Sequence, residues 1–166
     1  MSVNKRSSDA FTRIEGTELI MERFILAPQE LVYSAFTEPD HIRNWWGPFG
    51  WTTTNYQMDV RPGGIWHYCM RSADGEEAWG KTVYREVDPF SRLVYLDSFS
   101  DENGNDAEGF PLMLTTTEFI KEGNGTHIVS RTEFDSEEDL KKVMDMDAVE
   151  GMNQSFDRLE GYLSGK

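Results

Sequence analysis

The sequence predicts an α+β domain in which a curved antiparallel sheet is covered by one long C-terminal helix. Six segments between residues 52 and 134 alternate apolar and polar side chains with a period of two, which indicates strands. The connectors between them are short and rich in Gly, Pro, Asn and Asp, which is typical of hairpins in an antiparallel meander. The C-terminal segment instead carries apolar side chains at steps of three and four residues, which predicts a helix.

The chain is expected to begin its folded part with one strand and two short helices. Residues 17–26 alternate imperfectly and predict the first strand. Pro28 and Glu30 suit the first turn of a helix, because Pro lacks the unneeded N–H and an acid favours the helix dipole. Pro39 ends that helix, and a second short helix is expected around residues 41–45.

The six later strands and the closing helix follow in order. The strands are expected at residues 52–61, 65–71, 78–88, 93–99, 112–121 and 126–134. The closing helix is expected from about Asp145 to Leu163, and it is the only element large enough to cover the sheet. A curved sheet around one helix is usually not filled solidly at both ends, so the sequence also predicts an internal pocket.

Length and composition exclude several classes of protein. The chain has 166 residues, which predicts a single domain over residues 14–166 after a flexible tail over residues 1–13. Sixteen basic residues stand against 30 acidic ones, for a net charge of −14, which argues against nucleic acid and anionic membranes as partners. No apolar run is long enough to span a membrane, and no secretion signal is present in the sequence. We therefore expect a cytoplasmic protein without membrane insertion.

The strand after Gly63-Gly64 is the strongest candidate for a cavity wall. Strand alternation places Trp66, Tyr68 and Met70 on one face and His67 and Cys69 on the other. Three large, soft side chains in register are typical of a cavity lining, although ordinary core packing explains them as well. We expect this face to point inward.

Other candidate ligand contacts come from the remaining aromatic residues, one later strand and the closing helix. Of the adjacent tryptophans, we expect one to anchor a helix in the core and the other to lie at the cavity mouth; core packing of both is the alternative. The closing helix has a flank of small and flexible residues that suits a variable ligand, although a Met stripe is also typical of plain core. The complete set of expected ligand-binding residues is Trp45, Trp46, Trp66, Tyr68, Met70, Trp79, Met113, Thr115, Thr117, Met144, Ala148, Met152, Ser155 and Phe156.

The sequence offers no catalytic cluster and no metal site. His41, His67 and His127 are isolated in the sequence, with no ligand spacing around them, and a solvent-facing position is expected for each. The single cysteine, Cys69, has His67 two residues away, but a Cys–His nucleophile needs a contact geometry that sequence does not show. We expect no catalytic residues, no metal and no cofactor.

Several motifs resemble one known family along nearly the whole chain, over about residues 18–164. Each is modest alone, and together in this order they are specific. They are Ala27-Pro28-x-Glu30-Leu31-Val32-x-x-Ala35-Phe36-Thr37, Trp45-Trp46-Gly47-Pro48, Asp59-Val60-Arg61-Pro62-Gly63-Gly64-x-Trp66, Gly80 and Tyr84 with Val87-Asp88-Pro89, Arg92-Leu93-Val94-Tyr95, and Gly151-Met152-Asn153-Gln154-Ser155-x-x-Arg158-Leu159-x-x-Tyr162-Leu163. The chain thereby resembles the Aha1-like (activator of Hsp90 ATPase homologue 1-like) branch of the START-like, or SRPBCC, superfamily.

The resemblance implies a helix-grip fold of the START/Bet v 1-like kind, with a sheet wrapped around a C-terminal helix and an internal cavity. It implies that Met152 stands where the family usually has Trp, which makes the cavity wall more pliable at that point. Because one fold serves many functions, the resemblance alone does not decide the activity.

Three functional hypotheses follow, together with an open oligomeric state. The first is binding of a small apolar, aromatic or lipid-like molecule in the cavity. The second, from the family name, is a module that contacts a chaperone, for which the acidic stretch 133–150 is the candidate surface. The third is an enzyme that uses the cavity for a hydrophobic substrate. A homodimer through a sheet edge or face is compatible with the sequence.

Overall fold

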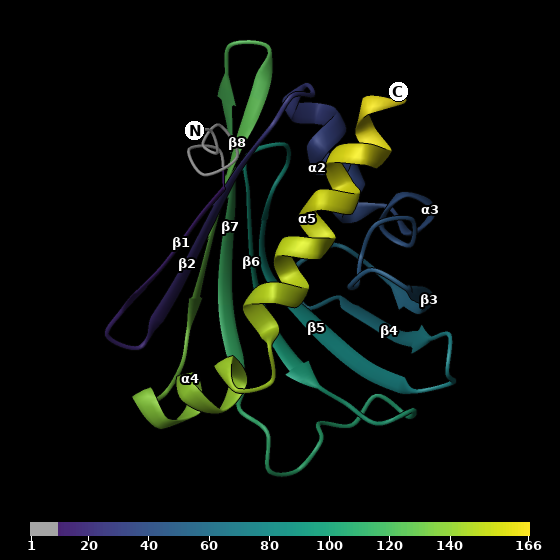
Figure 1. Ribbon diagram of the computed structural model, residues 1–166, viewed down its shortest axis with the longest axis vertical. Coiled ribbons are helices and arrows are strands. Elements are labelled where there is room, and N and C mark those ends of the chain that lie inside the picture. Colours follow the sequence, from purple (N-terminus) through teal and green to yellow (C-terminus); the bar gives the residue numbers. More distant parts are fainter. Residues whose placement is uncertain (1–9) are drawn as a thin grey trace.

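A single curved antiparallel sheet surrounds one face of a long helix in the computed structural model, which describes residues 10–166 (Figure 1). The elements in chain order are β1 (Ala10–Glu15), β2 (Glu18–Ile25), α2 (Gln29–Thr37), α3 (Pro39–Ile42), β3 (Trp51–Met58), β4 (Ile65–Ser72), β5 (Glu77–Asp88), β6 (Arg92–Phe99), β7 (Met113–Glu122), β8 (Gly125–Glu133), α4 (Glu137–Met144) and α5 (Ala148–Ser164). This order confirms the predicted α+β architecture.

Strands β3 to β8 form a meander, and the first two strands extend the sheet at the β8 edge, where β2 pairs with β8. The strand order is β1-β2-β8-β7-β6-β5-β4-β3, and every neighbouring pair is antiparallel. The register shifts between Asn55 and Gln57 in β3 and between Tyr84 and Glu86 in β5, and such bulges bend a strand. Helix α5 runs obliquely across the concave side, with α2 and α3 near its C-terminal half and α4 at its other end (Figure 1).

The N-terminal prediction is wrong for residues 10–13, which were expected in the flexible tail. They form the first part of β1, which pairs with β2 along its whole length. The strand escapes detection because its apolar side chains Phe11 and Ile14 are exposed, so backbone pairing rather than burial holds it. Residues 1–9, the remainder of the predicted tail, lie outside the described part of the chain.

The closing helix begins three residues later than expected because a separate helix precedes it. Ser136 caps α4 by accepting a hydrogen bond from the backbone N–H of Asp139 at 3.0 Å. Asp147 then takes a left-handed conformation with φ of 60°, which interrupts the helical path before Ala148. Met144, expected on the closing helix, therefore belongs to α4.

A buried arginine fixes α5 against the sheet. Arg23 on β2 is only 1% exposed, and its guanidinium donates to Asp157 Oδ1 at 3.0 Å and Glu160 Oε1 at 2.5 Å. The same guanidinium lies 5.4 Å from the centre of the Phe156 ring. Charge pairing and ring contact together determine how α5 lies across β2. None of the helices in residues 10–166 combines the length and the apolar character needed to cross a membrane.

Candidate ligand cavity

A cavity of about 230 Å³ lies between the concave face of the sheet and helices α4 and α5. Most of its lining is apolar or aromatic, and the polar groups come mainly from β6, β7 and β8. The lining residues are Leu19, Met21, Phe36, Trp46, Tyr68, Met70, Ala78, Trp79, Gly80, Tyr95, Asp97, Ser98, Phe99, Met113, Thr115, Thr117, Ser130, Thr132, Phe134, Val143, Ala148, Met152 and Phe156.

Many of the residues expected to contact ligand meet around this cavity. Strand β4 contributes two aromatic or flexible side chains, β7 contributes three residues from one face, and α5 contributes three more. This group consists of Trp46, Tyr68, Met70, Met113, Thr115, Thr117, Ala148, Met152 and Phe156. The structure thus places these residues on the wall of the cavity.

Four of the expected residues lie elsewhere or contribute differently. Trp45 is fully buried in the core, where its Nε1 donates to the carbonyl oxygen of Ala35 at 3.0 Å. Ser155 is buried, and its hydroxyl forms hydrogen bonds with backbone groups of Gly47 and Gly151. Met144, the last residue of α4, packs against the core and is not among the lining residues. Trp66 borders a smaller adjoining cavity of about 20 Å³.

The two adjacent tryptophans divide their roles at the loop after α3. Trp45 anchors the core, whereas Trp46 lines both cavities. Gly47 follows with φ of 106°, a conformation that a residue with a Cβ adopts only under strain. The sequence motif therefore holds one indole in the core and turns the next one toward the cavity.

Helix α5 clamps this loop through its polar side chains. The guanidinium of Arg158 donates to the carbonyl oxygens of Gly47 at 2.9 Å and Pro48 at 3.2 Å. The Ser155 hydroxyl accepts from the N–H of Gly47 at 2.9 Å and donates to the carbonyl of Gly151 at 3.2 Å. Because the loop carries Trp46, these bonds fix one wall of the cavity to the helix that closes it.

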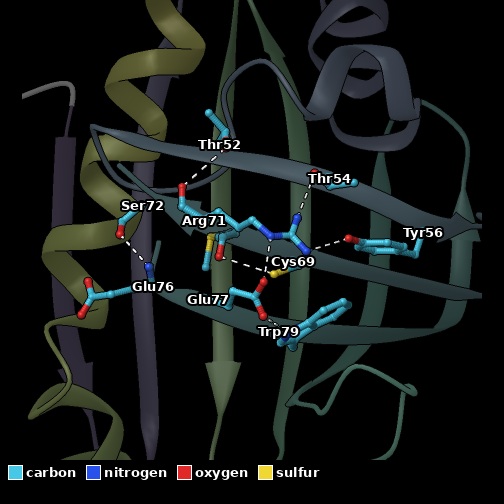
Figure 2. A network of polar contacts seen from close by, with 10 residues as sticks. Thr52, Thr54, Tyr56, Cys69, Arg71, Ser72, Glu76, Glu77 and Trp79 are labelled. Carbon is cyan, nitrogen blue, oxygen red and sulfur yellow. Dashed lines mark hydrogen bonds and ion pairs between the residues drawn. The ribbon is translucent and has the colours of Figure 1, made fainter. Parts of the chain in front are cut away.

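Trp79 borders the cavity, but its ring belongs to the opposite face of the sheet. There the ring stacks on His67 with centroids 5.3 Å apart and lies 5.0 Å from Tyr56. The Arg71 guanidinium contacts both Tyr56 and Trp79 and pairs with Glu77 at 3.0 Å (Figure 2). Strand pairing sets Trp79 opposite Cys69, so Trp79 borders the cavity while its ring packs on the outer face of the sheet.

The histidines are more enclosed than the sequence predicts. His67 is buried, and its Nε2 lies 3.1 Å from the carbonyl oxygen of Asp101. His41 and His127 are half-buried, with ring nitrogens 2.6 Å from the Tyr162 hydroxyl and from Glu22, respectively. All three were expected to face solvent, but aromatic stacking or a polar partner holds each of them against the protein.

Cys69 is a buried thiol. It is fully buried on the outer face of the sheet, and its Sγ lies 3.6 Å from the carbonyl oxygen of Met70. Burial raises the pKa of the Cys69 thiol, which disfavours the thiolate that a nucleophile needs.

Asp97 is the functional candidate that the sequence reasoning missed. Asp97 lies on β6 and borders both cavities. Its side chain is partly buried, and its accessible surface faces these cavities. Its removal from bulk water raises the pKa of Asp97 to about 7. The signal was available, because the alternation of β6 places this acid on the same face as Leu93, Tyr95 and Phe99.

Hydroxyl groups hold the Asp97 carboxyl in place. Thr82 Oγ1 donates to Asp97 Oδ1 at 2.6 Å, and Thr115 Oγ1 donates to Asp97 Oδ2 at 3.3 Å. Thr115 Oγ1 is also 3.1 Å from Thr132 Oγ1, and since the Thr115 proton goes to Asp97, Thr132 donates to Thr115. A carboxylate accepts about four hydrogen bonds, so the two threonines leave capacity for a donor in the cavity.

Neutral phenols complete the polar part of the site. Tyr95 and Thr117 share a hydroxyl hydrogen bond of 2.8 Å. Burial raises the pKa of both Tyr68 and Tyr95, so they remain uncharged near pH 7. Tyr68 lies flat over Gly80 of β5, where a Cβ would come within 2.4 Å of the phenol ring. Glycine at this position therefore makes room for one wall of the cavity.

The lining of the two cavities contains a single residue that ionises near neutral pH. Among the residues around the two cavities, Asp97 is the only one that is ionisable near neutral pH, and none is Lys, Arg, His or Glu. Within residues 10–166, no cluster of three or more His, Cys, Asp and Glu is arranged to hold a metal ion. The site is therefore suited to binding an apolar body and a single polar end.

The curved sheet, the closing helix and the cavity between them define a START/Bet v 1-like helix-grip domain. The family model for activator of Hsp90 ATPase homolog 1-like protein matches residues 26–164. The chain belongs to this family, which confirms the resemblance seen in the sequence.

Solved structures of bacterial proteins share this fold. Protein Ms6760 from Mycobacterium smegmatis is 26% identical, with a TM-score of 0.85 and coverage of 93% of this chain and 95% of that one. A protein from Staphylococcus epidermidis is 25% identical, with a TM-score of 0.82 and 93% coverage of both chains. A protein from Arthrobacter aurescens, at 24% identity, has a TM-score of 0.87 over 95% of this chain and 91% of that one. Comparison with curated proteins gives no match.

Proposed function

We propose that this protein binds a small apolar or aromatic molecule in the cavity between the sheet and α5. The observation that carries the proposal is the cavity itself, an apolar space of about 230 Å³ with a few polar groups gathered on one side. Small-molecule sites in proteins are typically built in this way. A core without a binding role is close-packed and leaves few voids larger than a water molecule.

The volume sets the size of the ligand. A protein cavity of about 150 Å³ is known to hold benzene, so about 230 Å³ accommodates roughly nine or ten non-hydrogen atoms. One fused bicyclic ring, or one ring with a short side chain, satisfies this limit. Long acyl chains and polycyclic molecules exceed it.

Cavity filling tests the proposal directly. We expect indole or 2-phenylethanol to bind the full chain with a Kd below about 1 mM, as measured by isothermal titration calorimetry. Met152→Trp replaces an unbranched side chain of the cavity wall by a larger indole ring, at a position where the family resemblance implies that Trp is tolerated. It is expected to weaken binding at least about tenfold, since the added ring occupies space that the ligand needs.

The same substitution elsewhere supplies the control. Met146 is 44% exposed between α4 and α5 and is not part of the lining, so Met146→Trp makes the same chemical change outside the cavity. Binding to this variant is expected to equal that of the unmodified protein. Equal loss in both variants, or no binding by the unmodified protein, contradicts the proposal.

A further inference from the structure

The cavity contains a partly buried acid that faces the cavity and has no basic partner in the lining, and this bears on what kind of ligand the cavity takes. Proteins normally pair a carboxylate that they remove from water, since an unpaired buried charge is costly. Within residues 10–166, Asp97 accepts hydrogen bonds from two neutral threonine hydroxyls, and no cation lines either cavity that it borders. The outer face of the same sheet, by contrast, pairs Glu77 with Arg71.

We propose, resting on the proposed function above, that the ligand is a small aromatic or alicyclic amine whose ammonium group binds Asp97. The carboxylate has capacity for further donors, and an ammonium supplies three. The apolar body of such a ligand lies against the apolar side chains, chiefly methionine and phenylalanine, that make up most of the lining. An ammonium thus supplies the cation that the fold leaves out.

The surroundings of Asp97 favour a cation over an anion from every side. The titratable groups facing it are Tyr68 on β4, Tyr84 on β5 and Tyr95 on β6, and burial raises the pKa of all three phenols, so they stay neutral. The residues that α2, α4, α5, β2, β7 and β8 contribute to the lining are all uncharged. Fatty acids and aromatic carboxylates would meet a like charge here and no compensating base.

Aromatic rings offer a second attraction for the ammonium. Trp46 and Tyr68 line the cavity with ring centroids 6.0 Å apart and nearly perpendicular, and Tyr95 borders the cavity beside Asp97. Ring faces attract cations, most strongly where water is excluded. The energy needed to dehydrate the ammonium is thereby offset by a carboxylate that the fold already shields from bulk water and by the neighbouring rings.

Affinity for such an amine should also depend on pH in a defined direction. Because the pKa of Asp97 is about 7, the carboxylate is mostly protonated at pH 6 and mostly ionised at pH 8. An alkylammonium stays protonated throughout this range, as the side chain of lysine does. We therefore expect an amine to bind about tenfold more tightly at pH 8 than at pH 6, whereas a neutral analogue shows no comparable change.

Three probes of matched shape test the inference: 2-phenylethylamine, 2-phenylethanol and phenylacetate, each titrated calorimetrically into the full chain at pH 8. The amine is expected to bind at least about tenfold more tightly than the alcohol, and phenylacetate most weakly. Asp97→Asn is expected to abolish the preference for the amine while changing the affinity for the alcohol less than about threefold. Retained alcohol binding shows that this variant is folded.

Asp106→Asn is the matched control. It removes the same charge from a carboxylate that pairs with Lys81 at 2.7 Å and does not line the cavity, so the preference for the amine should persist. The inference is overturned if the alcohol or phenylacetate binds as tightly as the amine, or if the preference survives Asp97→Asn. Those results leave cavity binding intact, whereas binding of none of the three probes contradicts both the inference and the proposed function.

Discussion

The two faces of strands β4 and β5 both carry aromatic side chains, but they differ in whether the charged group among those side chains is paired within the protein. On the outer face, Arg71 lies beside the rings of Tyr56 and Trp79 and pairs with Glu77 (Figure 2). On the inner face, aromatic residues again surround a charged group, but there the group is Asp97 on the adjacent strand β6 and its described protein partners are neutral.

This difference shows that the outer face pairs its charges within the protein, whereas the inner face leaves one acid without a cation in the lining. The outer cluster satisfies its cation within the protein, and it does so next to solvent, where an ion pair contributes little to stability. The inner carboxyl is removed from water without a protein cation, which raises its pKa to about 7 and costs stability whenever it ionises. Such a cost at a cavity wall is typical of a functional site.

The largest expected effect is a pH-dependent stabilisation by Asp97→Asn. The folded-state pKa of Asp97 is raised above its ordinary value near 4, so unmodified protein loses stability as pH rises between those values, and the loss is complete above the folded pKa. The advantage of Asp97→Asn in unfolding free energy should therefore grow by about 2 kcal/mol from pH 5.5 to pH 8.5. Urea denaturation at the two pH values measures this growth.

Asp106→Asn provides the comparison for that measurement. Hydrogen bonding to Lys81 lowers the pKa of Asp106, so its carboxylate is fully ionised across the same pH range. The effect of this variant on stability should consequently be the same at both pH values. If the gain in unfolding free energy from Asp97→Asn stays constant or shrinks as pH rises, ionisation of the Asp97 carboxyl does not destabilise the folded protein.

A smaller effect is expected from Gly80→Ala on the inner face. The new Cβ would lie 2.4 Å from the Tyr68 phenol, whose ring is stacked on Trp66 with centroids 4.1 Å apart. Displacing the ring costs about 1–2 kcal/mol of stability and moves it into the cavity. Thermal denaturation and titration with 2-phenylethanol should therefore both report a loss.

Gly161→Ala is the matched control for the glycine substitution. Gly161 is exposed on α5, and a Cβ there meets no atom within 4 Å. Because alanine favours helix more than glycine does, this variant should gain up to about 1 kcal/mol and bind as before. If Gly80→Ala behaves in the same way, the close approach of Tyr68 to β5 does not shape the cavity.

The smallest effect is expected on the outer face. Arg71→Ala removes the ion pair with Glu77 and the contacts with two rings, all of them next to solvent. We expect a slight decrease in melting temperature and a ligand affinity within about twofold of the unmodified protein. An effect on binding as large as that of Gly80→Ala would mean that the two faces are coupled through the sheet.

Much of the fold was predictable from local pattern. Period-two alternation located six of the strands, turn residues placed their connections, and the apolar stripe after residue 145 indicated the closing helix. The strand β1 was not predictable in this way, because Phe11 and Ile14 are exposed and the strand depends on pairing with β2. The separate helix α4 was missed despite the cap at Ser136, since its break from α5 depends on the backbone of Asp147.

The candidate site was predictable only in part. Alternation identified the inner faces of β4 and β7, so Tyr68, Met70 and Thr115 were expected at the cavity and lie there. Trp79 lies at the border of the cavity, but the packing of its ring on the outer face was not predicted, because that face depends on register with Cys69 across the sheet. The importance of Asp97 was missed although its face was readable, since its lack of a cation depends on residues from many distant segments.

By itself, the sequence determined the order and period of most elements, and therefore the class of fold and the family. Those properties depend on neighbours along the chain, which local spacing records. Only the tertiary structure decided which aromatic rings face the cavity, how Arg158 ties the Trp46 loop to α5, and that Asp97 meets no positive side chain in the lining. Each of these depends on groups far apart in sequence, because burial and charge pairing are determined by what surrounds a side chain in space.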